Sequence, residues 1–153
     1  MSAEMVFAVE PFSDAAIMEA MPLLRAHYEE LWMHKDIPLS PDFQRYYAFA
    51  QAGLLHYCTA RVNGELVGYC LSVLSRGLHY STVNFATNDI LFIRKDYRKG
   101  MAGMRLLRFM EEELSKMNIT FIQMHIKYDP DYSPLLGKMG YDPFEKIMMK
   151  RIK

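Results

Sequence analysis

Two long stretches of the chain carry apolar residues at the spacing of an amphipathic helix. In residues 15–32 the apolar positions recur every three to four residues, and Ser13 or Asp14 could cap the start of this helix. Pro22 lies inside the run and is expected to kink or divide it. Residues 101–117 predict a second long helix, because one apolar stripe is opposed by charged residues. The stripe consists of Met104, Leu107, Met110, Leu114 and Met117.

Between these two helices the pattern changes to short apolar runs that are typical of strands. Residues 54–62 and 65–75 are joined by Asn63-Gly64, a dipeptide that favours a two-residue hairpin because both positions tolerate positive φ. Residues 89–93 are apolar on both faces, which predicts a central strand covered by helices.

Shorter segments complete the order of elements. They are a strand over 5–9, a helix from Ser40 or Asp42 to about Ala52, a strand over 119–127, a short helix ended by Gly140, and a last strand in EKIMMKRI. The resulting order, β-α-α-β-β-β-α-β-α-β, contains no repeat, low-complexity segment or linker. We therefore expect residues 1–153 to form one α/β domain.

Composition narrows the class of protein. Hydrophobic residues make up 51% of the chain and charged residues 24%, as in ordinary globular domains. No apolar run approaches the ~20 residues that span a bilayer. The first residues include acids but no bases, unlike a signal peptide, so we expect a cytoplasmic protein. The net charge of zero argues against nucleic acid or an anionic membrane as a partner.

Positive charge is nevertheless concentrated in residues 94–108, where the only acid is Asp96. The basic residues are Arg94, Lys95, Arg98, Lys99, Arg105 and Arg108. A local patch on a neutral protein indicates a small anionic ligand, although a solvated helix flank would give the same pattern.

The two cysteines, Cys58 and Cys70, flank the predicted hairpin. If Val62 pairs with Glu65, then Cys58 faces Tyr69, and the two thiols point to opposite faces of the sheet. A disulfide is not expected, which agrees with a reducing compartment.

The sequence DYRKGMAGMRLL (96–107) places a glycine-bearing turn between the strand over 89–93 and a long helix. Unpaired N–H groups and the helix dipole make such a turn a phosphate-binding site. The spacing fits neither G-x-x-x-x-G-K-[ST] nor G-x-G-x-x-G, so a P-loop or a dinucleotide fold is not expected.

This segment resembles motif A of the GNAT N-acetyltransferase superfamily. The matching residues are Leu91 and Ile93 in the strand, Tyr97-Arg98 at the start of the turn, Gly103, and Leu106-Leu107 in the helix. GKMGY (137–141) resembles the family's later G-F/G-Y element, and HYEEL, PLSPD and GLHY are similar to short GNAT proteins of bacteriophages and prophages.

The resemblance implies a GNAT fold, with a mixed sheet, an antiparallel N-terminal half, two splayed parallel strands and helices on both faces. It implies transfer of an acetyl group from acetyl-CoA to a primary amine by direct attack, with no metal. The pantetheine arm of coenzyme A would lie along the strand, and the turn would hold its pyrophosphate. The implied residues are Leu91, Phe92, Ile93, Arg98, Lys99, Gly100, Met101, Ala102, Gly103 and Met104, with Arg105 or Arg108 as further phosphate partners.

The resemblance also suggests catalytic groups. Asp89 lies where many members carry an acid that takes a proton from the amine, although a strand-start cap is an equally open role. Tyr132 could protonate the leaving thiolate, with His125 or solvent as alternatives.

Acceptor binding in this family falls to the first helices and to the loop before the central strand. The candidates are Glu29, Glu30, His27, His79 and Tyr80. Two carboxylates near a cleft would attract a cationic amine, although a solvated helix face also explains Glu29 and Glu30.

Three features depart from the family pattern. Met101 stands where the motif has a glycine, Leu136 stands where many members have a tyrosine acid, and only about ten residues follow Gly140-Tyr141. A catalytically degenerate GNAT that binds acyl-CoA or a protein is therefore the alternative hypothesis. The short C-terminus would also allow a partner chain to complete the sheet in a homodimer.

Overall fold

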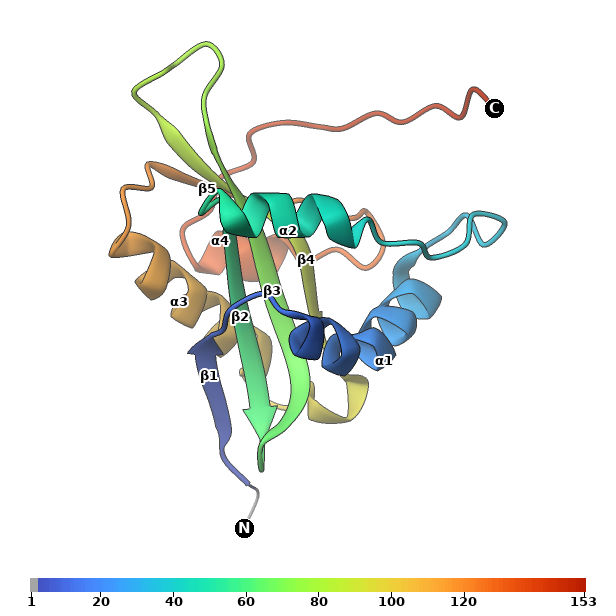
Figure 1. Cartoon of the computed structure of the whole chain (residues 1–153). Helices are drawn as coiled ribbons and strands as arrows, with labels where there is room; N and C mark the ends of the chain where they lie inside the picture. Colours follow the sequence, from blue (N-terminus) through green and yellow to red (C-terminus); the bar gives the residue numbers. More distant parts are fainter. Residues whose placement is uncertain (1–2) are drawn as a thin grey trace.

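A five-stranded sheet lies at the centre of the structure, a computed structural model that describes residues 3–153 (Figure 1). The strands are β1 (Met5–Val9), β2 (Leu55–Val62), β3 (Glu65–Arg76), β4 (Asn84–Ile93) and β5 (Phe121–Gln123). They follow each other in space in this order. Neighbouring strands are antiparallel, except that β5 runs parallel to β4. This is the mixed sheet that the family resemblance implied.

Helices cover both faces of the sheet. They are α1 (Asp14–Leu31), α2 (Phe43–Gln51), α3 (Ala102–Ser115) and α4 (Ser133–Lys138), and a 3₁₀ turn spans Lys95–Tyr97. Val67 of β3 packs in one apolar cluster with Leu106 and Met110 of α3, whereas Leu66 packs in a second cluster with Leu23 of α1. Because adjacent strand residues point to opposite faces, α1 and α3 lie on opposite sides of the sheet, as Figure 1 shows.

The structure settles which residues cap the two N-terminal helices. The Ser13 hydroxyl accepts a hydrogen bond from the Ala16 N–H (3.2 Å), and the Asp42 carboxylate accepts one from the Arg45 N–H (3.1 Å). Pro22 was expected to kink or divide the first helix; it does not divide it, because α1 is continuous across Pro22. Pro22 is exposed, so water can bond the carbonyl that its missing N–H leaves free.

Three predicted strands differ from the structure. The strand expected over 89–93 begins earlier, at Asn84, because β4 pairs with β3 from that residue onward. The strand expected over 119–127 is reduced to Phe121–Gln123, because the chain beyond Gln123 diverges from β4 and loses its hydrogen-bond partners. The last strand, expected in EKIMMKRI, does not form, and residues 141–153 contain neither helix nor strand. Figure 1 shows this C-terminal segment extending away from the sheet, where no neighbouring strand pairs with it.

The predicted facing of the cysteines is also wrong. Val62 pairs with Glu65 as expected, but a β-bulge at Ala60/Arg61 shifts the register, so that Cys58 lies opposite Cys70. Both thiols therefore point to the α3 side, where both cysteines are fully buried and free. Burial raises the pKa of the Cys58 thiol to about 12.

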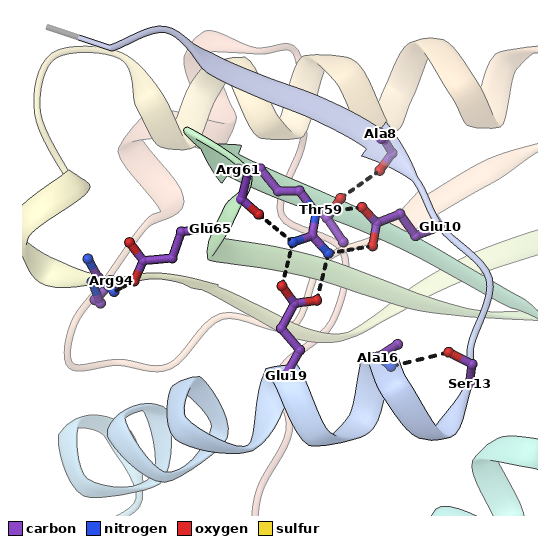
Figure 2. Close-up of polar contacts among 10 residues, drawn as sticks. Ala8, Glu10, Ser13, Ala16, Glu19, Thr59, Arg61, Glu65 and Arg94 are labelled. Atoms are coloured by element: carbon purple, nitrogen blue, oxygen red, sulfur yellow. Dashed lines mark hydrogen bonds and ion pairs between the residues drawn. The ribbon is translucent and has the colours of Figure 1, made fainter.

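Arg61 lies at this register shift, and its guanidinium lies between two carboxylates (Figure 2). Its Nε and Nη2 donate to Glu10, just after β1, at 2.7 and 2.9 Å. Its Nη1 and Nη2 donate to Glu19 of α1 at 2.5 and 2.7 Å, and Nη1 also donates to the Gly64 carbonyl. Arg61 therefore fastens the β1–α1 connection to the sheet, and hydrogen bonds from Arg61 lower the pKa of both glutamates.

We expect Arg61→Ala to lower the free energy of unfolding by about 2–3 kcal/mol, because it leaves two carboxylates without their shared partner. Arg94→Ala is the matched control: its partners Glu65 and Asp96 are more exposed, at 58% and 61%, so a loss below ~1 kcal/mol is expected. Urea denaturation measures both values. Equal losses would contradict the role assigned to Arg61.

The difference between wild type and Arg61→Ala should also depend on pH. Because both glutamates have lowered native pKa values, their contribution is complete above the ordinary pKa of 4.5 and is lost as pH falls through the native values. Denaturation at pH 7 and at stepwise lower pH values should show the two proteins converging. A constant difference across this range would be inconsistent with the ion pairs.

Candidate active site

The site begins where β4 and β5 separate. Their pairing covers only three residues of each strand, Phe85–Thr87 and Phe121–Gln123. Beyond Thr87, the edge of β4 that faces away from β3 therefore has no strand partner among the described residues. Leu91, Phe92 and Ile93 lie along this edge with their side chains in the two apolar clusters. The backbone is therefore the part of these residues that faces the opening between the strands.

Asp89 is the extra residue of a β-bulge in β4. Leu71 of β3 pairs with Ile90 and Ser72 pairs with Asn88, so Asp89 has no partner across the strand. The buried Asn88 amide fills the bulge by donating to the carbonyls of Leu71 (3.3 Å) and Ile90 (3.1 Å).

The carboxylate of Asp89 is held by α2. The Tyr46 hydroxyl donates to Asp89 Oδ2 at 2.5 Å, and burial together with this bond raises the pKa of Tyr46. Tyr46 also packs, partly buried, against the apolar cluster on the α1 side of the sheet. Its contact joins positions 43 residues apart, and no local pattern in the sequence signals it.

A cavity of about 470 Å³ lies between α1, the loop that follows it, and strands β2 to β4, and both Asp89 and Tyr46 line it. Most of its wall is apolar or aromatic. Its apolar members include Phe12, Ile17, Leu24, Trp32, Ile37, Leu39 and Phe43. Volume and lining are those of a small-molecule pocket.

His27 and Tyr69 supply a second polar group to this cavity. A hydrogen bond of 3.0 Å joins His27 Nδ1 to the hydroxyl of the buried Tyr69, and the imidazole stacks on Phe92. Burial, followed by the nearby charge of Lys127, lowers the pKa of His27 to about 4. At neutral pH this imidazole is therefore uncharged.

The predicted phosphate turn begins α3. Gly100 has φ +60°, and the helix starts at Ala102 after Met101, which makes no side-chain capping bond in the described structure. The first N–H groups of α3 therefore lack intrahelical partners. A Cβ added at Gly103 would meet no atom within 4 Å, and the Met101 side chain is 53% exposed, so the backbone of the turn is open to a ligand.

The family resemblance implies that Arg98 binds coenzyme A and that Glu30 binds the acceptor, but the two side chains contact each other. Arg98 donates to both oxygens of Glu30, at 2.5 and 2.7 Å, and its Nε donates to the Ile93 carbonyl at 2.5 Å. This pair connects α1 to the end of β4, and the charge of each residue is balanced by the other. Tyr132 lies near enough for both charges to influence its pKa, which burial raises.

Other candidates lie apart from the cavity. Glu29 is 71% exposed and pairs with Lys35. His79 and Tyr80 lie in the β3–β4 loop, which projects from the sheet in Figure 1, and neither lines the cavity. His125 is exposed in the segment after β5.

The basic residues of the turn have several partners. Arg94 pairs with Glu65 and Asp96, and Arg105 stacks on Phe7. Lys99 and Arg105 also line a second cavity of about 660 Å³ between the turn and the first strand. Among residues 3–153, no group of three or more His, Cys, Asp or Glu side chains could hold a metal ion, and no helix is long and apolar enough to cross a membrane.

The splayed parallel strands, the bulge and the open glycine turn together define an acetyltransferase fold. The model of the Acetyltransferase (GNAT) family matches residues 17–141 of this sequence. The chain belongs to the GNAT family, whose members use acetyl-CoA as a co-substrate. A comparison with curated proteins finds no match.

Solved structures agree with this fold. A ribosomal-protein-alanine N-acetyltransferase from Brucella melitensis biovar Abortus 2308 has a TM-score of 0.73 at 15% identity, covering 98% of this chain and 100% of that one. A putative acetyl transferase from Pyrococcus furiosus has a TM-score of 0.73 at 20% identity, covering 97% and 100%. An aminoglycoside acetyltransferase from an uncultured soil metagenomic sample, in complex with sisomicin, gives 0.73 at 11%, covering 97% and 95%.

We expect the His27 imidazole to titrate near pH 4 rather than at its ordinary 6.5, because the buried ring disfavours charge. The unfolded state binds this proton first, so the contribution of His27 to stability should fall as pH drops from 6.5 toward 4. NMR titration, with the signal assigned through His27→Gln, measures the midpoint. A midpoint at or above 6.5 would contradict this placement.

Proposed function

We propose that the protein is an N-acetyltransferase that transfers the acetyl group of acetyl-CoA to a primary amine by direct attack. The observation that carries the proposal is the position of Asp89. The bulge directs its carboxylate into the cavity at the point where the edge of β4 becomes free. One residue thus borders both an acceptor-sized pocket and the strand edge that leads to the turn before α3.

The residues of this chain fit coenzyme A. Beyond Thr87 the edge of β4 has no β5 partner, so its backbone groups at Leu91–Ile93, apart from the Ile93 carbonyl that Arg98 occupies, can pair with the amides of the pantetheine arm. The N–H groups from Lys99 to Met104 can bind the pyrophosphate. The open space at Gly103 supports close approach of a phosphate to the backbone. Lys99, Arg105 and Arg108 are better placed to neutralise phosphate than Arg98, because Glu30 already binds Arg98.

Asp89 is assigned the role of general base. An alkylammonium group has a reference pKa of ~10.4 and must lose a proton before its nitrogen can attack. Asp89 accepts that proton, directly or through water, while the Tyr46 bond fixes the carboxylate. Acetyl-CoA supplies a thioester whose acetyl carbon bonds to the amine nitrogen as its C–S bond breaks. A free N–H of β4 stabilises the negative charge on the carbonyl oxygen.

Tyr132 is assigned the role of acid that protonates the leaving thiolate. Leu136 cannot replace the family tyrosine as the acid, because its hydrocarbon side chain has no proton to donate; it is 3% exposed and packs in the core. Tyr132 lies one helical turn earlier, at the N-cap of α4, and is 41% exposed.

The buried free thiols, Cys58 opposite Cys70, support a reducing compartment such as the cytoplasm. We also propose a homodimer in which the C-terminal tail of one chain adds to the edge of the other chain's β5. In support, the tail exposes five large apolar side chains. They are Phe144, Ile147, Met148, Met149 and Ile152.

Asp89→Asn is expected to lower kcat/KM by about 10²–10⁴ with coenzyme A affinity retained, because only the proton acceptor is removed. Thiol release from acetyl-CoA with an amine panel measures the rate. Asp14→Asn is the matched control, because Asp14 also accepts a bond from a tyrosine of α2, Tyr47, but does not line the cavity. Equal activity of Asp89→Asn and wild type would contradict the assignment of Asp89 as the general base.

A graded series at Gly103 separates cofactor binding from folding. Gly103→Ala and Gly103→Leu should fold as well as wild type, because the position is helical and open. Coenzyme A affinity should fall modestly for Ala and about tenfold or more for Leu, whose side chain occupies the phosphate space. Calorimetry measures the affinity. Wild-type affinity of the Leu variant would contradict the cradle, and tight binding without turnover of any amine would favour the degenerate alternative.

A further inference from the structure

We propose that the acceptor is a primary amine that carries an aromatic or similarly large apolar body and a carboxylate. Asp89 receives the amine, and Lys127 receives the carboxylate. This inference rests on the proposed function and adds the class of substrate.

The wall of the cavity argues for the apolar body. Side chains such as Leu24, Trp32 and Phe43 dominate the lining, and half of the fewer polar lining residues are tyrosines. A volume of about 470 Å³ accommodates a ring-bearing amine of modest size. Burying apolar ligand surface against such a wall supplies the main favourable free energy of binding.

The charges of the lining argue against a polycation. Asp89 is the one acidic residue among the lining side chains, and Lys127 is the one lysine or arginine. His27 is uncharged at neutral pH. A polyamine or an aminoglycoside would bring several ammonium groups to a single carboxylate and would be repelled by Lys127.

Lys127 is held at the cavity without an anion. Its Nζ donates to the Leu31 carbonyl at the end of α1 (2.7 Å) and lies 5.5 Å from the centre of the Trp32 ring. No ion pair of the described residues includes Lys127. Burial and the nearby Lys35 lower its pKa, which is the direction expected of a cation that lacks an opposite charge.

The neighbouring charges of this region are already matched. Lys35 pairs with Glu29, Arg98 with Glu30, and Arg151 with Asp36. An ammonium group has three donors, and the Leu31 carbonyl uses one of those of Lys127. A substrate carboxylate would complete this set.

Asp89 and Lys127 come from the two parts of the chain that separate after the β4–β5 pairing. Asp89 lies in β4 at the bulge, and Lys127 lies four residues beyond the end of β5. A molecule with a positive amine and a negative carboxylate is complementary to this pair of charges, and its apolar body can pack against the apolar wall of the same cavity.

The test compares acetylation of L-phenylalanine, phenethylamine and spermidine by the full chain. Phenethylamine lacks only the carboxylate, so wild type should prefer L-phenylalanine by about tenfold or more in kcat/KM, the value of one good ion pair. Spermidine should be the poorest acceptor. Lys127→Met should reduce the L-phenylalanine/phenethylamine ratio about tenfold, and Lys127→Arg should restore most of it.

Lys35→Met is the matched control. Lys35 also donates to carbonyls at the end of α1, those of Tyr28 and Glu29, but it does not line the cavity. This variant should keep the wild-type ratio. A wild-type preference for spermidine or phenethylamine, or a ratio unchanged by Lys127→Met, would overturn the inference while leaving acetyl transfer in place.

Loss of the proposed function is detected separately. If no amine is acetylated, calorimetry measures the binding of N-acetyl-L-phenylalanine and N-acetylphenethylamine, and so tests whether Lys127 binds a carboxylate in the cavity. Tighter binding of the carboxylate compound, reduced by Lys127→Met, would still support the inference. Equal or absent binding of both compounds would overturn it.

Discussion

At the bulge opposite Leu71 and Ser72, strand β4 has one residue more than β3, and the arrangement of the candidate site depends on that extra residue, Asp89. A regular strand would continue its alternation of side chains and its pairing without interruption. The bulge breaks the alternation once, and Asn88 compensates by bonding the carbonyls on either side. The result is a carboxylate placed in an apolar pocket from a strand whose other side chains build the core.

The charge pattern of the site is simple because most charged residues bind each other. Arg98 and Glu30 form a bidentate pair that joins α1 to the end of β4. Arg61 joins α1 to the sheet at its other end through Glu19. These contacts fix the helix that forms one wall of the cavity. They leave Asp89 and Lys127 as the charged residues that line the cavity and are available to a ligand there.

Much of the fold could be predicted from sequence because the signals are local. The Asn63-Gly64 turn, the apolar stripe of α3 and the glycine turn before it each depend on residues within a few positions. The order of elements and the mixed sheet followed from these signals and from the resemblance to motif A. The turn that we propose binds coenzyme A could be located for the same reason.

The features that could not be predicted from the sequence depend on contacts between residues that are far apart in the chain. The bulge at Ala60/Arg61 reversed the expected facing of Cys58, because one extra residue changes the register of every position beyond it. The bond from Tyr46 to Asp89 and the pair of Arg98 with Glu30 join residues 43 and 68 positions apart. The last strand was predicted from its composition, but a strand also needs a neighbouring edge, which this tail does not find within its own chain.

Acetyl-CoA is proposed to bind along the free edge of β4 and to present its thioester beside Asp89. A crystal structure of the protein with coenzyme A would test this binding mode. We expect pyrophosphate on the N–H groups around Gly103, pantetheine beside Leu91–Ile93, and the thiol at the mouth of the cavity lined by Asp89. Coenzyme A bound elsewhere, or a thiol separated from that cavity by the sheet, would contradict it.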